Sequence, residues 1–269
     1  MKKVILITGS TDGIGLETAR LLVEQGHYVL LHGRNSMKLD EVKEKLLSLP
    51  GIGQVESYLA DLSKMSDVES LASEIEQKHN KLDVLINNAG IFRTAETVTD
   101  QGLDARFAVN TIAPYLLTQR LLPLIDASGR IVNLSSAAQS PVNLDVLRGN
   151  TQISDDFAAY AQSKLAITMW SRSLGLSLEG KGPSVVAVNP GSLLGSKMVK
   201  EGFGVDGGDI RIGADILIRA ALSDEFESAN GKYFDNDAKQ FAAPHADALD
   251  DKKSAEVVQA IEAVLAKKT

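Results

Sequence analysis

Short runs of apolar, largely β-branched residues alternate along the chain with longer segments whose apolar positions recur with helical spacing. The short runs, of which the last is the weakest, are KVILITG, HYVLLHG, VESYLAD, LDVLINNAG, GRIVNLSS, SVVAVNPG and GKYF. Helical spacing predicts helices over residues 14–25, 37–48, 66–79, 101–125, 157–179, 209–223 and 254–267. Apolar strands that alternate with helices are typical of a parallel sheet covered on both faces. We therefore predict an α/β fold, a doubly wound parallel sheet of about seven strands.

No repeat, low-complexity tract or linker divides the sequence, so we expect a single domain over residues 1–269. Two irregular stretches stand out: residues 137–156 follow the fifth predicted strand, and residues 192–209 follow the sixth. Ligands of such sheets bind beyond the carboxyl ends of the strands, from which both stretches leave. The glycines and apolar residues of 192–209 predict a mobile lid, with permanent packing on the sheet or on a second subunit as the alternative.

Composition narrows the classes of partner. The chain has 28 Lys and Arg against 35 Asp and Glu, a net charge of -7, which disfavours nucleic acid and anionic membrane surfaces. It has no cysteine, and its four histidines lack metal-ligand spacing, so we predict no metal site. The N-terminal apolar run breaks at Thr8 and Gly9, too early for an export signal or a membrane span. We expect a cytoplasmic protein.

The first predicted strand runs into a glycine-rich turn, TGSTDGIG, and a helix begins at once. Gly9 permits a tight turn, Gly13 lets the backbone approach a pyrophosphate, and Gly15 allows the helix to pack closely on the strand. The free amides of the helix N-terminus suit a phosphate. A purely structural turn is the alternative, but the place after strand one favours a dinucleotide site. The contacts expected from this turn are Gly9, Ser10, Thr11, Asp12, Gly13, Ile14 and Gly15.

The second strand ends in LLHGRN, where an NAD site usually carries an acidic residue for the ribose 2′-hydroxyl. Gly33 stands at about that place, and Arg34 follows it. A guanidinium can bind a 2′-phosphate with two hydrogen bonds, so NADP is favoured over NAD, with Arg34 and Asn35 as contacts. An arginine on a solvated loop is the alternative.

Two more candidate segments follow the third and fourth strands. The Asp61 carboxylate can accept from an adenine amino group while the Leu62 amide addresses the ring, although a helix N-cap at Asp61 or Ser63 is a comparable account. The NNAG of residues 87–90 predicts a polar turn under a ribose, or turn chemistry alone. The contacts expected from it are Asn88, Ala89 and Gly90.

Tyr160 and Lys164 lie four residues apart in AAYAQSKLAI, so a helix presents both side chains on one face. A nearby ammonium favours the phenolate and lowers the tyrosine pKa from about 10 toward neutrality. Such a tyrosine exchanges protons with an alcohol or a carbonyl. The pair by itself is also compatible with a partly buried tyrosine beside a surface lysine.

Together these segments resemble the short-chain dehydrogenase/reductase family, with its Rossmann-type sheet, over essentially the whole chain. Residues 8–15 look like its TGxxxGxG motif, residues 87–90 are its NNAG, and Tyr160 to Lys164 match its YxxxK. The remaining matches are the helix-four asparagine at Asn110, the catalytic serine at Ser136, and the PG motif at Pro190 and Gly191.

The resemblance implies a role for each matching residue. Tyr160 is the general acid and base, and Lys164 lowers its pKa and binds the nicotinamide ribose. Ser136 hydrogen-bonds the substrate oxygen, and Asn110 holds a water that connects Lys164 to solvent. The cofactor contacts then also include Tyr160, Lys164, Pro190 and Gly191.

Two departures from the family pattern matter. The gap between Ser136 and Tyr160 is longer than in compact members, and this resembles the retinol dehydrogenase-like branch. After Pro190-Gly191 the family usually has a threonine that contacts the nicotinamide carboxamide. Gly195 fills that register here, so we assign the contact to Ser196.

We therefore expect an NADPH-dependent oxidoreductase that reduces a carbonyl or oxidises the corresponding alcohol. A catalytically inactive dinucleotide-sensing or scaffold protein is the alternative, whereas light-dependent protochlorophyllide reduction is disfavoured because the chain lacks cysteine. The expected partner is a small, largely apolar carbonyl or alcohol. The resemblance also allows a homodimer or homotetramer through the helices predicted over 101–125 and 157–179.

Overall fold

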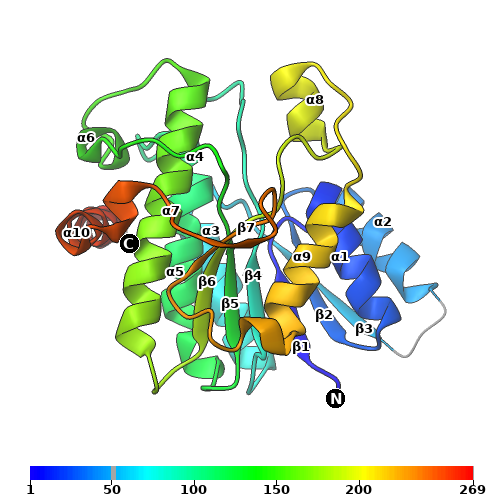
Figure 1. The fold of residues 1–269 in the computed structure, drawn as a ribbon. Helices are drawn as coiled ribbons and strands as arrows, with labels where there is room; N and C mark the ends of the chain where they lie inside the picture. The colour runs from blue at the N-terminus through cyan, green and yellow to red at the C-terminus, as the bar shows by residue number, and fades with distance from the viewer. Residues whose placement is uncertain (50–52, 269) are drawn as a thin grey trace.

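The computed structural model describes residues 1–49 and 53–268, and one sheet runs through it (Figure 1). The strands follow the order β3-β2-β1-β4-β5-β6-β7-β8. All neighbouring pairs are parallel except β7 and β8. The strands are β1 (Val4–Ile7), β2 (Tyr28–Gly33), β3 (Gln54–Leu59), β4 (Val84–Asn87), β5 (Arg130–Leu134), β6 (Ser184–Asn189), β7 (Tyr233–Asp235) and β8 (Gln240–Ala242).

The order of the strands reverses between β1 and β4. The chain runs from β1 outward to β3 and then returns to place β4 on the other side of β1. This reversal makes a switch point at the carboxyl ends of β1 and β4, the expected place for a ligand in a doubly wound sheet. The predicted fold class is therefore confirmed.

The sheet has one strand more than we predicted. β8 is three residues long and follows a turn in which Lys239 has a positive φ of 55°. Three residues are too few for a recognisable alternation of apolar and polar positions. The strand forms because its backbone pairs with β7, a contact that sequence periodicity does not reveal.

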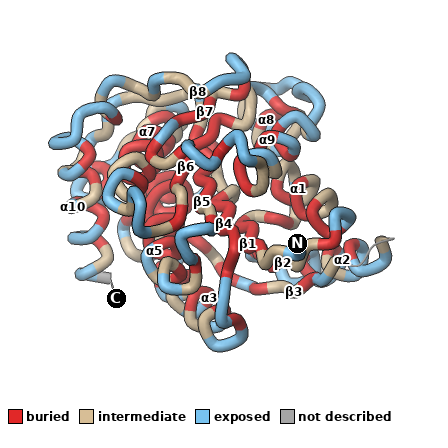
Figure 2. Tube along the Cα trace, turned by 60° about the horizontal axis from the view of Figure 1, so that its bottom comes forward, coloured by how far each residue is buried: buried red, intermediate tan, exposed pale blue. Residues whose placement is uncertain are grey.

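Helices cover both faces of the sheet because successive strand residues point to opposite sides. Leu6 and Leu85 join a core with α3, α5, α7 and α10, whereas Ile7 and Ile86 join a second core with α1, α2 and α9. Figure 2 shows these strands buried between the layers. The α-helices are α1 (Gly13–Glu24), α2 (Ser36–Leu47), α3 (Met65–Lys78), α4 (Ala105–Phe107), α5 (Ala113–Leu121), α6 (Leu144–Leu147), α7 (Asp156–Leu178), α8 (Lys197–Phe203), α9 (Arg211–Leu222) and α10 (Asp251–Lys268).

The helix predicted over 101–125 begins only at Ala105 and is not uniform. A π-helical turn, Ala108–Ile112, separates α4 from α5, and a 3₁₀ turn, Leu122–Leu124, ends the segment. The irregular stretches 137–156 and 192–209 contain the short helices α6 and α8. Both are too short to show a helical period in the sequence.

The C-terminal helix α10 packs on the outer side of α7 and α5 (Figure 1). Its residues Val257, Ile261 and Val264 are buried, and Glu262 accepts a hydrogen bond of 2.9 Å from the Tyr115 hydroxyl on α5. Part of the surface that we considered for subunit pairing is therefore covered by the chain itself. No helix in the described part of the chain combines the length and apolarity needed to cross a membrane.

Candidate active site

The glycine-rich turn after β1 is held by the NNAG turn after β4. Asn88 Nδ2 donates to the carbonyls of Thr8, at 2.9 Å, and Gly9, at 3.0 Å. The Ala89 amide donates to Thr8 Oγ1 at 3.1 Å. Gly9 has a φ of +65°, a left-handed conformation that favours glycine. The two segments singled out in the sequence therefore meet at the switch point, and Asn88 fixes the shape of the turn.

The glycine-rich turn leaves no room for a side chain at Gly15 but leaves open space at Gly13. A Cβ atom on Gly15 would lie 2.3 Å from the Gly9 carbonyl oxygen and 2.4 Å from Asn88 Nδ2. A Cβ on Gly13 would meet nothing closer than 3.8 Å, where Ile210 and Ser196 lie. The backbone at the start of α1 thus faces free space, as a pyrophosphate requires. These residues fit a bound dinucleotide.

Two residues of the turn are tied to β2 by His32, a residue that the sequence analysis did not single out. His32 Nδ1 accepts from the Gly9 amide at 3.0 Å, and Nε2 donates to the Ala60 carbonyl at 3.1 Å. The Ser10 hydroxyl accepts from the His32 amide at 2.9 Å. Burial lowers the pKa of His32 to about 4, so the ring is neutral at pH 7. The sequence feature that could have identified His32 is its place as a polar residue within the apolar strand HYVLLHG.

The end of β2 combines a crowded glycine, Gly33, with an exposed arginine, Arg34. A Cβ on Gly33 would lie 2.6 Å from Thr11 Cγ2, so the Thr11 methyl fills the place of a longer side chain. The Arg34 side chain is exposed, and it forms no hydrogen bond or ion pair with another residue of the described ranges 1–49 and 53–268. Asn35 caps α2 by accepting from the Lys38 amide at 3.0 Å. Lys38 also pairs with Asp12, the N-cap of α1, at 2.7 Å.

Asp61 forms a local turn rather than a helix cap. Its Oδ1 accepts from both the amide and the hydroxyl of Ser63, at 3.0 and 2.8 Å. The N-cap of α3 is Lys64, so neither Asp61 nor Ser63 caps that helix. Leu62 is buried. The adenine contacts of Asp61 and Leu62 stay a prediction.

The candidate catalytic residues converge beside Gly90. A Cβ built on Gly90 would lie 3.4 Å from Lys164 Nζ and 3.4 Å from Asn110 Oδ1. Lys164 Nζ donates to the Leu134 carbonyl at 2.7 Å and lies 5.7 Å from the centroid of the Tyr160 ring. The Ser136 side chain lies close enough to the Tyr160 phenol to lower the pKa of that phenol. Side chains from α7, the π turn and the end of β5 thus form one cluster.

The charge states within this cluster differ from our expectation. Burial raises the pKa of Tyr160 above its ordinary value, and the hydrogen bond with Ser136 opposes this effect. Burial lowers the pKa of Lys164 to about 8. In the protein without a bound cofactor, burial therefore opposes the predicted lowering of the Tyr160 pKa by Lys164, and that role of Lys164 stays a prediction. Desolvation disfavours both charged forms, and the lysine amine is directed at Leu134.

Asn110 is held by the protein on both ends of its amide. Oδ1 accepts from the Ile91 amide at 2.8 Å, while Nδ2 donates to the Ile91 carbonyl at 2.9 Å and to Ser163 Oγ at 3.0 Å. The Ser163 hydroxyl donates to the Tyr160 carbonyl at 2.7 Å. Asn110 lies in the π turn, and such turns recur at functional sites. It therefore joins the turn after β4 to α7, and its implied water stays a prediction.

The segment 192–209, which we predicted to be a lid, is a loop whose ends are joined. The Gly195 amide donates to the Gly208 carbonyl at 2.7 Å, and the Gly208 amide donates to the Leu193 carbonyl at 2.8 Å. Helix α8 lies between these ends at the top of Figure 1. Ser196 caps it by accepting from the Val199 amide at 3.3 Å, and the Ser196 side chain lies beside Gly13.

The apolar residues of this loop are divided between burial and exposure. Leu194 and Val199 are buried, whereas Leu193 and Val205 are 48% and 43% exposed. The Phe203 side chain lies outside what the structure describes. Pro190 and Gly191 lead into the loop, and the Pro190 carbonyl accepts from Asn236 Nδ2 at 2.9 Å. The loop is therefore fixed at its base. Its buried apolar residues agree with permanent packing, whereas its exposed apolar residues agree with a lid that closes on a ligand.

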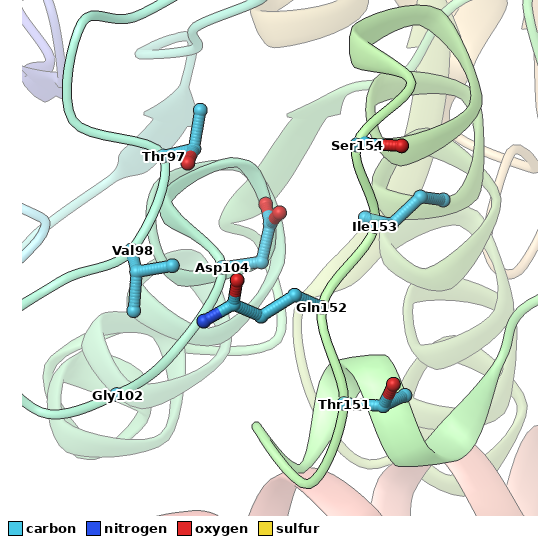
Figure 3. Close-up of a pocket in the computed structure, with 8 residues that line it drawn as sticks. All are labelled: Thr97, Val98, Gly102, Asp104, Thr151, Gln152, Ile153 and Ser154. Carbon is cyan, nitrogen blue, oxygen red and sulfur yellow. The ribbon is translucent and has the colours of Figure 1, made fainter.

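A hollow of about 370 Å³ is lined by none of the candidate catalytic residues, and Figure 3 shows the residues that do line it. It separates the loop before α4 from the end of the 137–156 stretch, and none of its lining residues was predicted as a site residue. The buried Arg106 closes this region by donating to Asp104 at 2.7 Å and to Asp156 at 2.8 Å. The hollow is lined by Thr97, Val98, Gly102, Asp104, Thr151, Gln152, Ile153 and Ser154.

Comparisons with known proteins agree with this site. The family described as short chain dehydrogenase matches residues 3–203. Retinol dehydrogenase 13 of Homo sapiens is 30% identical over 263 residues, which cover 91% of this chain and 80% of that protein. Polyprenol dehydrogenase of Homo sapiens is 32% identical over 256 residues, covering 87% and 77%.

Comparison with a solved structure shows that the similarity extends to the three-dimensional fold. The landomycin C-6 ketoreductase LanV with bound NADP and rabelomycin is similar with a TM-score of 0.68 and 26% sequence identity, covering 87% of this chain and 94% of that one. The chain therefore belongs to the short-chain dehydrogenase/reductase family, in its retinol dehydrogenase-like branch, as an oxidoreductase of alcohol and carbonyl groups that uses a nicotinamide dinucleotide.

Proposed function

We propose that the enzyme reduces a largely apolar carbonyl compound with NADPH, or oxidises the corresponding alcohol with NADP⁺, and that Tyr160 is its general acid and base. The observation that carries this proposal is one cluster of four side chains, with Asn110 and Lys164 beside Gly90, Tyr160 next to Lys164, and Ser136 next to the Tyr160 phenol. An inactive sensor or scaffold has no need of these four residues in one place.

The chain's own groups perform the proton transfer. The bound dinucleotide supplies or accepts the hydride. Ser136 donates a hydrogen bond to the substrate oxygen as negative charge develops there, and the Tyr160 hydroxyl then gives its proton to that oxygen. Because burial raises the pKa of Tyr160, the phenol keeps its proton at neutral pH and is ready to act as an acid. Lys164 would hold the ribose hydroxyls of the bound dinucleotide, and Asn110 would hold the water of the proton path.

The preference for NADP is supported by the residues at the end of β2. An acidic residue at position 33 would collide with the Thr11 methyl, which a Cβ there approaches to 2.6 Å. Arg34 is exposed beside this place. The side chain of Lys38, paired with Asp12 at 2.7 Å, adds a second cation nearby. LanV was solved with NADP, which supports the same cofactor here.

An apolar substrate is supported by the aromatic side chains beside Tyr160. The Phe92 ring centroid lies 5.3 Å from that of Tyr160 and 6.4 Å from that of Phe157. Phe157 is 51% exposed, although it is a large apolar residue one turn before Tyr160. Retinol and polyprenol, named for two relatives, are long apolar alcohols. A ligand with extended apolar surface would cover the exposed ring.

The substitution Tyr160→Phe tests the assignment because it removes only the acidic proton and keeps the ring. We expect the rate of NADPH oxidation with a panel of aldehydes, ketones, quinones and steroids to fall at least about 10²-fold. NADPH binding, followed by fluorescence, should stay nearly intact. More than a tenth of the wild-type rate in this variant would refute the role of Tyr160. A wild-type protein that binds NADPH but reduces no member of the panel would favour the sensor.

A further inference from the structure

Phe92, shortly after the NNAG turn, packs against the Tyr160 ring in an edge-to-face arrangement. The Phe92 and Tyr160 ring planes meet at 68°, with centroids 5.3 Å apart. Phe92 is only 5% exposed, so this arrangement is held by packing. Edge-to-face aromatic pairs have a preferred geometry, and a fixed Phe92 therefore restricts the orientation of the Tyr160 phenol.

The other side of Phe92 faces helix α8. A Cβ atom on Gly202 would lie 2.5 Å from Phe92 Cδ1 and 2.7 Å from Cε1. Contacts this short force one side to move, so only glycine at position 202 allows α8 to rest on the Phe92 ring in the observed position. Phe92 is thus enclosed between the candidate lid and the catalytic tyrosine.

Arg93 spans the same two helices at the surface. Its Nη1 donates to the Glu201 carbonyl in the last turn of α8 at 3.4 Å, and its Nε lies 3.7 Å from Asp156 in the first turn of α7. The guanidinium carbon lies 5.6 Å from the centroid of the Phe92 ring. These contacts are long, and the Arg93 side chain is 56% exposed, so they contribute little stability. Phe92 must therefore carry most of the connection.

We propose that Phe92 is a positioning residue that couples the seating of α8 to the orientation of Tyr160, with Arg93 as a weaker second connection. This proposal rests on the proposed function of Tyr160. When α8 is seated, Gly202 supports the Phe92 ring, and the ring edge fixes the phenol in line with the substrate oxygen. When α8 lifts, Phe92 loses its support and the phenol loses its fixed direction. The enzyme is then most active only when the lid covers the substrate, which keeps water from the hydride transfer.

The substitution Gly202→Ala tests the contact directly, and Gly208→Ala is its matched control in the same loop. A Cβ on Gly208 meets only the Leu193 carbonyl oxygen, at 3.9 Å. We expect Gly202→Ala to lower kcat about 5- to 30-fold through misorientation, with a smaller change in KM. It should also speed tryptic cleavage after Lys197 and Lys200 several-fold in the presence of NADPH. Gly208→Ala should behave as wild type in both assays.

The double variant Phe92→Leu/Gly202→Ala separates coupling from a general loss of stability. Leucine keeps apolar volume but removes the ring atoms that the new methyl would strike. If the proposal holds, Gly202→Ala lowers kcat by less than twofold when added to Phe92→Leu. Phe92→Leu alone should shift the alkaline limb of the kcat–pH profile, which a purely structural role would leave in place. Losses that multiply in the double variant, or an unchanged kcat in Gly202→Ala, would overturn the coupling.

Failure of the proposed function is distinguishable from failure of this inference. A wild-type protein without carbonyl reductase activity would sink the function and, with it, the role of Phe92 in catalysis. If wild-type activity is present but Phe92→Leu keeps the wild-type kcat and pH profile, the function stands and the coupling fails. Unfolding temperatures of all variants show whether each one is folded under the assay conditions.

Discussion

The cofactor end and the substrate end of the site are built in different ways. At the cofactor end, short backbone and buried side-chain contacts fix the chain: Asn88 and His32 both bond to the glycine-rich turn. At the proposed substrate end, a loop with joined ends carries α8, which also rests on Phe92 and accepts a long hydrogen bond from Arg93, and the loop exposes Leu193 and Val205. Under the proposed function, this difference means that the enzyme fixes the part that binds the dinucleotide and leaves adaptable the surface that would meet an apolar ligand.

Among the substitutions considered, Gly15→Ala should cause the largest loss of cofactor binding. In Gly15→Ala the new methyl would lie 2.3 Å from the Gly9 carbonyl oxygen, so the turn or α1 must shift. We expect NADPH affinity to fall about 100-fold, on the order of 3 kcal/mol, with a lowered unfolding temperature. Titration calorimetry measures the affinity, and Gly208→Ala serves as the control. An affinity within threefold of wild type would mean that the turn is more adaptable than its contacts indicate.

The stability of the cofactor end should depend on pH because protonation of His32 opposes its buried position. Its pKa is about 4 in the folded protein, against an ordinary value of about 6.5 for histidine. A depressed folded pKa gives stability that is fully present above pH 6.5 and lost as the pH falls toward 4. We expect the free energy of unfolding to decrease by about 3 kcal/mol over this window because of His32. Burial also lowers the pKa of His27, which adds a loss of the same sign.

Denaturant unfolding at several pH values measures this loss in wild type and in His32→Gln. The variant cannot be protonated, so its stability should decline less between pH 6.5 and pH 4. His245→Gln is a suitable control because it leaves His32 and His27 unchanged. Equal slopes in wild type and His32→Gln would show that His32 does not control the acid sensitivity of the turn.

Arg34 sharpens the comparison because it lies at the cofactor end but is exposed. We expect Arg34→Ala to weaken NADPH binding by about 1.5 to 3 kcal/mol, the loss of a charge-assisted pair, while NADH binding changes little. The contrast between the two cofactors is the measurement. Equal weakening would assign Arg34 a structural role, and an unchanged NADPH affinity would leave the NADP preference without support.

The smallest effect is expected at the substrate end. Trypsin should cleave the wild-type loop after Lys197 and Lys200 quickly without ligand and several-fold more slowly with NADPH, with a further decrease when an apolar substrate analogue is added. Gel electrophoresis over time records the rates. Equal rates under all conditions, or full resistance without ligand, would favour permanent packing of α8.

The sequence predicted the site where its chemistry is local and missed what depends on distant contacts. The glycine turn, NNAG and the Tyr160–Lys164 pair are short motifs on predictable elements, and the structure brings them together. β8, α6 and α8 are too short to show periodicity. The roles of His32 and Phe92 arise from partners 23 and 68 residues away. The opposing effect of burial on the Tyr160 pKa was not predicted, because charge spacing along a helix says nothing about burial.

The packing of α10 has a consequence for assembly. Because this helix is tethered to the same chain, its local concentration beside α5 and α7 is on the order of millimolar or above. A second subunit that approaches the covered part of these helices must compete with that tethered occupant and displace the buried Val257, Ile261 and Val264. At ordinary cellular concentrations of one protein, the intramolecular contact has the advantage. Self-association of this enzyme would therefore have to use surfaces that α10 leaves free.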